Sequence, residues 1–366
     1  MKQTIALVLV LAVFIVSLNA TACAFEFPLS AQAYVLYCVE NDTLLISHNE
    51  NEKMKPASTT KIMTTLLALE EAQKNDKLVS FCESMIAEGS SMYLKVSDTV
   101  HLSDLCIGMM MASGNDAANA AAISISGDIE KFSELMNNRA KSIGMKNTNF
   151  VTPSGLDDEM HYSTAYDMAL LMACAIKNEE FAQLTREKSM MVDFLTPQKQ
   201  VTYTNHNRLL SMYEHCIGGK TGYTKSAGRC LVTAAKKDGL TLVCVTLNAS
   251  DDWNDHIKMY DYGFEKLCGI DTDDSDERYT IDVVGSDVDR VSLYCDISGN
   301  TAVDKEDKDK VKKTVYMPSF VYAPVNVGEY IGMVVYTLDD KVIASNPVFA
   351  KESADRIKSK SFWDLF

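Results

Sequence analysis

The chain has 366 residues, of which 47% are hydrophobic and 23% charged, and its formal net charge is −15. This is the composition of an ordinary globular protein, and the length favours two domains or three. The negative charge argues against a nucleic-acid-binding protein, because such a chain offers no basic face to displace counterions.

The first 24 residues are predicted to be a signal peptide. Lys2 provides a short positive region, residues 5–18 form an apolar run, and Ala22-Cys23-Ala24 fits a cleavage site. The competing interpretation is an uncleaved membrane anchor, but the run is shorter than the ~20 residues that a spanning helix needs. We therefore expect a mature chain from about Phe25 that is exported and works at the outer face of the cell membrane or in the cell wall.

The ten cysteines and six histidines show neither a CxxC pair nor a metal-ligand spacing. Most of the cysteines lie in apolar surroundings, which predicts free buried thiols and leaves one disulfide open. His161, His206 and His215 are interpreted as structural or as lining the rim of a cleft. No metal and no cofactor are therefore expected.

The predicted elements run from strands to helices and back to strands. In chain order they are a hairpin of residues 34–39 and 43–47, a helix over 58–71, a mostly helical stretch over 102–143, a helix over 166–176 opened by a capping box at 163–167, a hairpin of 230–235 and 240–248, and an amphipathic helix over 253–267. Trp253, Ile257, Tyr260 and Phe264 are predicted to share one side of the last helix. Because strands precede and follow the helices, the two ends must meet in one sheet.

This order predicts an α+β fold over residues 25–270, in which an antiparallel sheet is flanked by a helical cluster. An acidic stretch, 271–278, is interpreted as a linker, and 279–350 is predicted to form a small all-β domain. The tail, 351–366, mixes basic residues with terminal aromatic ones. Contact with a membrane surface and a plain disordered end fit this tail equally well.

An S-x-x-K motif, Ser58 to Lys61, opens the first predicted helix. The spacing places both side chains on one helix face, where the lysine can take the proton of the serine hydroxyl. That role needs a lysine pKa lowered by burial or by a nearby cation, for which Lys220 is the candidate. Taken alone, the motif is better explained by a helix cap followed by a solvated lysine.

Two more short motifs follow along the chain. Ser113-Gly114-Asn115 comes after an apolar run and predicts a tight turn that presents a hydroxyl and an amide. Lys220-Thr221-Gly222, followed by Tyr223, lies ahead of a strand. Its glycine lets a substrate approach the backbone as another strand would, and its lysine and threonine suit a carboxylate. Each motif in isolation also fits a plain turn.

Together and in this order, the three motifs resemble those of the serine D-alanyl-D-alanine carboxypeptidases, the low-molecular-mass penicillin-binding proteins with a β-lactamase/transpeptidase-like fold. The resemblance covers about residues 25–269 and, more loosely, the β domain. The further stretches that carry it are 147–150 (Asn-Thr-Asn-Phe), 155–156 (Gly-Leu), 161–168 (His-Tyr-Ser-Thr-Ala-Tyr-Asp-Met) and 205–210 (Asn-His-Asn-Arg-Leu-Leu).

The resemblance implies a reaction on peptidoglycan stem peptides that end in D-Ala-D-Ala. Ser58 would be acylated by the penultimate D-alanine with Lys61 as general base, the terminal D-alanine would leave, and water would resolve the acyl-enzyme. Ser113 and Asn115 would assist proton transfer and position the substrate. β-Lactam antibiotics would mimic the substrate and block Ser58.

The same resemblance assigns substrate binding to Lys220, Thr221, Gly222 and Tyr223. Lys220 and Thr221 would bind the terminal carboxylate, and the backbone N–H groups of Ser58 and Tyr223 would form the oxyanion hole. Three alternatives stay open. A β-lactamase would need a deacylating base, for which no matching motif is seen; a D,D-endopeptidase often lacks the β domain; and an inactive wall-binding scaffold would not need intact motifs.

Overall fold

A five-stranded antiparallel sheet organises the larger part of the molecule, in a computed structural model that describes residues 28–295 and 299–357. The strand order is β2-β1-β9-β8-β7. The strands are β1 (Ala33–Cys38), β2 (Thr43–His48), β7 (Cys216–Thr224), β8 (Gly228–Lys237) and β9 (Leu240–Leu247). In the pairing of β1 with β9, Val35 lies opposite Val245. The prediction that both ends of this region meet in one sheet is therefore confirmed.

Both faces of this sheet are covered, so its central strands are apolar on both sides. Successive side chains of a strand point to opposite faces. Val35 and Val243 belong to the core shared with the helical cluster, whereas Leu36 and Cys244 belong to a second core beneath α8 (Asp252–Lys266). This double burial explains why β9 reads as a continuous apolar run rather than as an alternating one.

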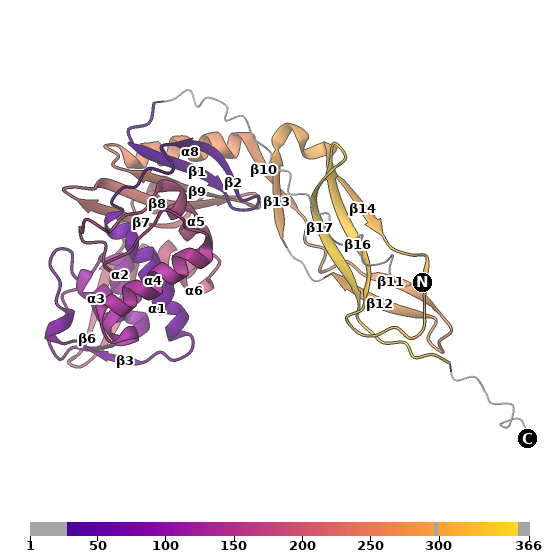
Figure 1. The fold of residues 1–366 in the computed structure, drawn as a ribbon, viewed down its shortest axis with the longest axis horizontal. Coiled ribbons are helices and arrows are strands. Elements are labelled where there is room, and N and C mark those ends of the chain that lie inside the picture. Colours follow the sequence, from indigo (N-terminus) through magenta and orange to yellow (C-terminus); the bar gives the residue numbers. More distant parts are fainter. Residues whose placement is uncertain (1–27, 296–298, 358–366) are drawn as a thin grey trace, which may run out of the picture.

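The helices between β2 and β7 pack on one face of the sheet (Figure 1). They are α1 (Lys61–Ala72), α2 (Leu102–Met111), α3 (Asn115–Ser126), α4 (Ile129–Ile143), α5 (Ala165–Ala175), α6 (Glu179–Arg186) and the short α7 (Leu209–Met212). The predicted helical stretch 102–143 is three helices, interrupted at 112–114 and at Gly127-Asp128. Asp128 caps α4 by accepting from the Lys131 N–H, and Thr164 caps α5 by accepting from the Asp167 N–H.

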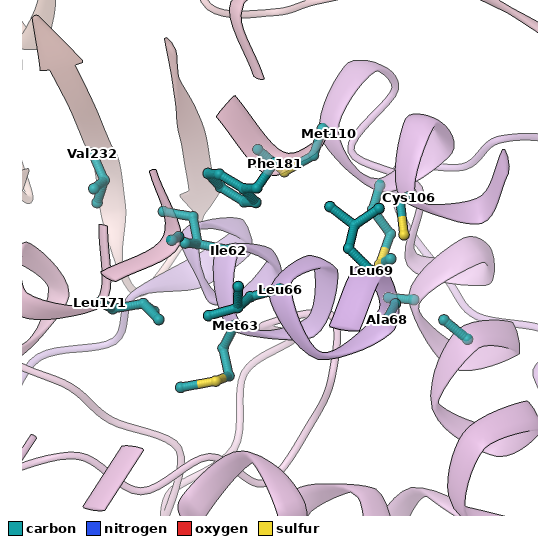
Figure 2. Packing of buried hydrophobic residues seen from close by; sticks show 14 of the residues in the cluster. Ile62, Met63, Leu66, Ala68, Leu69, Cys106, Met110, Leu171, Phe181 and Val232 are labelled. Atoms are coloured by element: carbon teal, nitrogen blue, oxygen red, sulfur yellow. The ribbon is translucent and has the colours of Figure 1, made fainter. Parts of the chain in front are cut away.

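Helix α1 lies inside this cluster and is buried on several sides. Figure 2 shows Ile62, Met63, Leu66 and Leu69 of α1 among apolar side chains of other elements. Those labelled neighbours are Cys106 and Met110 of α2, Leu171 of α5, Phe181 of α6 and Val232 of β8. Because close-packed interiors resist displacement, the N-terminal end of α1 is held in place by its whole length.

The buried face of α8 differs in part from the predicted one. Tyr260 and Phe264 are buried as expected, but Trp253 and Ile257 are only half-buried. His256 is fully buried and hydrogen-bonded through both ring nitrogens to hydroxyls of the sheet, those of Thr233 and Thr246, at 2.8 and 3.1 Å. A polar residue satisfied in this way can occupy the core face, and apolar periodicity alone does not detect it.

The second region is a six-stranded sheet with its own core, so the prediction of a C-terminal all-β domain is confirmed. Its order is β14-β16-β17-β12-β11-β15, and the β11–β15 pair is parallel. The strands are β11 (Tyr279–Val284), β12 (Arg290–Cys295), β14 (Lys312–Tyr316), β15 (Phe320–Tyr322), β16 (Tyr330–Leu338) and β17 (Lys341–Ala350). The 3-10 helix η3 (Lys305–Lys310) precedes β14.

A two-stranded sheet joins the two regions (Figure 1). In it β10 (Leu267–Asp271) pairs with β13 (Asn300–Asp304). The Asn41 side chain, in the β1–β2 turn, accepts from the Ala302 N–H and donates to the Ala302 carbonyl. Within the acidic stretch 271–278, Thr272 and Asp274 are buried. The smaller hairpins are β3 (Leu78–Ser80) with β4 (Thr99–His101), and β5 (Ser189–Leu195) with β6 (Gln198–Thr204).

The nine cysteines of the described residues carry free thiols, and six of them are buried. No helix in the part of the chain that the structure describes is long and apolar enough to cross a membrane. The predicted signal peptide, 1–24, and the end of the predicted tail, from residue 358, lie outside the described residues.

Candidate active site

Three segments that are far apart in sequence meet at the N-terminal end of α1. Ser58 lies on the 3-10 helix η1 (Ala57–Thr60), which runs directly into α1 at Lys61. The Lys61 Nζ atom is 3.0 Å from Ser58 Oγ and 2.7 Å from Asn115 Oδ1. The Lys220 Nζ atom, from β7, is 3.0 Å from Ser113 Oγ. The structure therefore brings together the residues predicted as catalytic and the lysine predicted to bind substrate.

The Lys61 amine is completely buried among neutral acceptors. Besides Ser58 and Asn115, it donates to the Ser154 carbonyl at 2.7 Å. The Asn115 amide is oriented because its Nδ2 donates to the Glu88 carbonyl, which turns Oδ1 toward Lys61. Burial, and then the charge of Lys220, lower the pKa of Lys61 well below its usual range. A neutral amine that donates to Asn115 and Ser154 keeps its lone pair for the Ser58 proton.

Lys220 is the second buried lysine of the site. Its Nζ donates to Ser113 Oγ and, at 2.9 Å, to the Thr221 carbonyl. Burial lowers the pKa of Lys220 to about 7. Ser113 has a φ of +55°, a conformation that a non-glycine residue adopts only when its surroundings hold it there. The turn between α2 and α3 therefore presents the Ser113 hydroxyl to Lys220 under local strain.

The end of β7 passes close to the start of η1. A Cβ atom placed on Gly222 would lie 3.1 Å from the backbone nitrogen of Ser58 and 3.0 Å from the Pro56 carbonyl oxygen. A side chain at this position would force the strand and the backbone at Ser58 apart by a few tenths of an ångström, so glycine favours this close approach. Thr221 is half-buried, whereas Tyr223 is 65% exposed. The strand β7 is an edge of the sheet, and on its outer side Thr185 of α6 bonds both backbone groups of Gly219.

A loop that the sequence motifs do not contain completes the site. Residues 151–158 supply the Ser154 carbonyl that accepts from Lys61. Gly155, at a φ of +80°, packs so tightly on η1 that an added Cβ would lie 1.9 Å from the Ala57 carbonyl oxygen. A backbone carbonyl has no residue signature in a sequence. The pair Gly155-Leu156 is the only signal that pointed to this loop.

His161 connects this loop to η1 and does not reach the catalytic atoms. Its Nδ1 accepts from the Val151 and Thr152 N–H groups at 3.0 and 3.2 Å, which places the proton on Nε2. Nε2 then donates to Thr60 Oγ1 at 2.9 Å. Burial lowers the pKa of His161 to about 4, so the ring is neutral at pH 7. The structural interpretation of this histidine is confirmed.

Asp116 is a buried carboxylate beside the site that sequence reasoning missed. It lies in the first turn of α3 and accepts from the Met92 and Leu94 N–H groups and the Ser91 hydroxyl, at 2.8, 3.0 and 2.7 Å. It therefore holds the loop 88–94 against Asn115. Its charge also opposes the lowering of the Lys61 pKa.

The remaining histidines of interest, His206 and His215, make no hydrogen bond to Ser58, Lys61 or Lys220 in the contacts described. His206 is exposed at the surface, where partial desolvation, followed by the charge of Lys220, lowers its pKa. His215 packs edge-on against Tyr213 and Phe264. Among the described residues, no group of three or more His, Cys, Asp and Glu side chains is arranged to hold a metal ion.

Comparison with known proteins gives two family matches that divide the chain. A family model described as D-alanyl-D-alanine carboxypeptidase matches residues 19–251. A second model, described as the C-terminal domain of penicillin-binding protein 5, matches residues 272–356. The boundary between them falls close to the junction of the two sheets. Both regions therefore have counterparts in known families.

Individual relatives span both regions. D-alanyl-D-alanine carboxypeptidase DacF of Bacillus subtilis is 33% identical over 347 residues, 88% of this chain and 86% of its own length. DacC of Escherichia coli is 32% identical, over 89% and 84% of the two chains. The crystal structure of penicillin-binding protein 5 from Haemophilus influenzae has a TM-score of 0.71 and 30% identity, over 91% of this chain and all of the other. For DacD of Francisella tularensis the TM-score is 0.65 and the identity 28%, over 90% and 95%.

Proposed function

Because this chain belongs to the D-alanyl-D-alanine carboxypeptidase family, we propose that it is a serine D,D-carboxypeptidase with Ser58 as its nucleophile. The observation that carries the assignment of Ser58 is the 3.0 Å contact between its Oγ and the buried amine of Lys61. A hydroxyl becomes a useful nucleophile at neutral pH when a neutral base lies within hydrogen-bond distance.

Acylation begins when the Ser58 proton moves to Lys61 Nζ. The freed Ser58 Oγ attacks the carbonyl carbon of the penultimate D-alanine in a peptidoglycan stem peptide. When the tetrahedral intermediate collapses, the peptide bond breaks, and the amine of the terminal D-alanine takes a proton and leaves. We assign Ser113 and Asn115 to this proton transfer and to holding the substrate. The hydrogen bonds that join Ser113 to Lys220 and Asn115 to Lys61 support this assignment.

Substrate binding is assigned to the end of β7. The cation of Lys220 and the hydroxyl of Thr221 bind the terminal carboxylate, and the backbone N–H groups of Ser58 and Tyr223 stabilise the oxyanion. The close packing of Gly222 on the Ser58 nitrogen supports this, because it places the two backbones side by side. Water then hydrolyses the acyl-enzyme and restores the Ser58 hydroxyl. β-Lactams acylate the same serine and inhibit the enzyme.

Cellular placement follows from the reaction, since the substrate lies outside the cytoplasm. We propose residues 1–24 as the export signal, 25–270 as the catalytic domain with 271–278 as its linker, 279–350 as the β domain, and 351–366 as a tail that touches the membrane surface. The apolar run at 5–18 and the aromatic end of the tail support the two terminal assignments. Binding of the chain from residue 25 to anionic vesicles, with and without 351–366, tests the tail.

The decisive experiment uses the chain from residue 25 and its Ser58→Ala variant. Both are incubated with fluorescent penicillin and with a peptide ending in D-Ala-D-Ala, and label and released D-alanine are followed over time. Lasting label and D-alanine release with the unmodified chain alone support the proposal. Rapid loss of label with hydrolysis of the drug would indicate a β-lactamase. Cleavage of cross-linked muropeptides in preference to the linear peptide would indicate an endopeptidase. Absence of label on the folded protein would indicate an inactive scaffold.

A further inference from the structure

Asp157 lies where the two halves of the site approach each other at the surface. Its carboxylate accepts from Thr224 Oγ1 at 3.0 Å and from Ser226 Oγ at 2.6 Å. Thr224 is the last residue of β7, directly after Tyr223, and Ser226 lies in the β7–β8 turn. The Lys55 ammonium is 4.0 Å from the same carboxylate and 3.3 Å from Ser226 Oγ. Asp157 therefore faces two hydroxyl donors and one cation.

The loop on which Asp157 sits is fixed to the general-base side of the site. Ser154, three residues earlier, accepts from Lys61 through its carbonyl. Gly155 is in contact with Ala57, and the loop is further tied to η1 through His161. The position of Asp157 is thus set by the same elements that hold Ser58 and Lys61.

Beyond Gly222, which packs on η1, the end of β7 is held by its pairing with β8 and by the side-chain contacts of Thr224 and Ser226. β7 is an edge strand, so on the side away from β8 no strand holds it. Tyr223 is largely exposed, which leaves its side chain little part in fixing the strand. In the part of the chain that the structure describes, the Asp157 carboxylate is the ionised group that bonds both hydroxyls beyond Tyr223. Charge-assisted hydrogen bonds are stronger than neutral ones, and these two lie at the surface, where solvent weakens them.

We propose that Asp157 is a positioning residue, which couples the loop at the general base to the strand end that carries the Tyr223 N–H. This inference rests on the proposed function, in which that N–H stabilises the oxyanion. Loss of the carboxylate lets the end of β7 move relative to Ser58. Since oxyanion donors act only at a fixed distance from the developing charge, the acylation step slows while the fold is retained.

The experiment measures acylation of Ser58 by fluorescent penicillin and kcat and KM for a D-Ala-D-Ala peptide, in the chain from residue 25. Asp157→Ala is compared with Ser226→Ala and with the double variant. Asp158→Asn is the matched control, because it removes the same charge one residue away, where the carboxylate accepts from the Met160 N–H. Thermal unfolding is recorded for every variant.

We expect Asp157→Ala to acylate about 10- to 100-fold more slowly, mainly through kcat, with Tm within about 2 °C of the unmodified chain. The acylation rate of Asp157→Asn, which keeps one acceptor oxygen, should lie between that of Asp157→Ala and that of the unmodified chain. In the Asp157→Ala background, Ser226→Ala has little further effect, because the two residues act through one contact.

Acylation of folded Asp157→Ala at the unmodified rate would overturn the inference. Equal slowing of acylation in Asp158→Asn would also overturn it, because the effect would then come from net charge. So would fully additive effects of Asp157→Ala and Ser226→Ala on the acylation rate in the double variant. Absence of label on the unmodified chain is a separate result, which would overturn the proposed function and this inference with it.

Discussion

The two regions of the molecule each bond a lysine amine to several oxygen acceptors, and the charge of those acceptors differs. In the catalytic region, Lys61 and Lys220 donate only to hydroxyl, amide and carbonyl oxygens in the contacts described. In the β domain, Lys313 Nζ lies 2.6 Å from the fully buried Asp274 and 3.0 Å from Glu277. Burial lowers the pKa of Lys313, but the bonds to both carboxylates outweigh it and raise the pKa above its usual range.

This difference separates a chemical role from a structural one. A buried amine without a carboxylate partner is destabilised as a cation, so its pKa is lowered. An amine between two carboxylates stays charged and fixes the groups around it. Asp274 also accepts from Tyr336 Oη at 2.9 Å and Asn346 Nδ2 at 2.7 Å. Asp274 thereby ties the stretch 271–278 to β16 and β17, and Lys313 of β14 balances its charge.

The sharpest test of the contrast is Lys61→Met, for which the largest effect is expected. Acylation by fluorescent penicillin should fall at least about 1000-fold, since general-base catalysis is lost. The midpoint of thermal unfolding should stay the same or rise, because an apolar side chain replaces a buried amine. Acylation within about tenfold of the unmodified chain would mean that Lys61 is not the base.

The pH dependence of stability should distinguish Lys220 from Lys313. Between pH 7 and 9 an unfolded lysine keeps its proton, whereas folded Lys220, with a pKa of about 7, releases it. The folded state binds fewer protons, so the free energy of unfolding should rise with pH relative to Lys220→Met, by about 1 kcal/mol per pH unit.

For Lys313, the contribution to the free energy of unfolding falls with pH instead of rising, and it does so in a different pH range. Because its pKa is raised in the folded state, Lys313 stabilises that state fully at pH values below its pKa in the unfolded chain, about 10.5. This stabilisation is lost only as the pH rises through the pKa of Lys313 in the folded state. The difference between Lys313→Met and the unmodified chain should therefore be constant from pH 7 to 9. Urea unfolding at several pH values checks both expectations. They would be contradicted if the difference in free energy of unfolding from the unmodified chain changed with pH in the same way for Lys220→Met and Lys313→Met.

Lys313→Met should destabilise the β domain while leaving catalysis intact. Removing one partner leaves the Asp274 charge buried, which costs about 1–3 kcal/mol here, less than for a fully buried pair because the Lys313 side chain is 35% exposed. Penicillin acylation of Ser58 should proceed at the unmodified rate. A slowed acylation would show that the β domain influences the site across the β10–β13 junction.

The smallest effect is expected for Glu277→Gln. Glu277 is also a partner of Lys313, but its side chain is 52% exposed and solvent screens the attraction. The free energy of unfolding should change by less than about 0.5 kcal/mol in a urea titration. A loss as large as that of Lys313→Met would mean that the exposed carboxylate, and not Asp274, is the effective partner.

The site illustrates how far sequence reasoning reaches. Ser58, Lys61 and Lys220 could be singled out from the sequence because each proposed role requires a particular side chain and those side chains stand in short motifs, and the structure brings them together. The Ser154 carbonyl was not, because every residue has one and only the path of the loop aims it at Lys61. Asp116 and Asp157 were missed for a related reason: a carboxylate that holds backbone N–H groups or hydroxyls looks in the sequence like any acidic surface residue.

Apolar periodicity and the order of elements determined by themselves that strands at both ends enclose a helical cluster and that a β-rich region follows. The motifs likewise determined the type of chemistry. Tertiary structure alone decided the charge states on which that chemistry depends. The pKa of a lysine depends on how far water is excluded and on which oxygens face the amine. Lys61 and Lys313 are the same type of residue in the sequence, and only the packing around them lowers the pKa of one and raises that of the other.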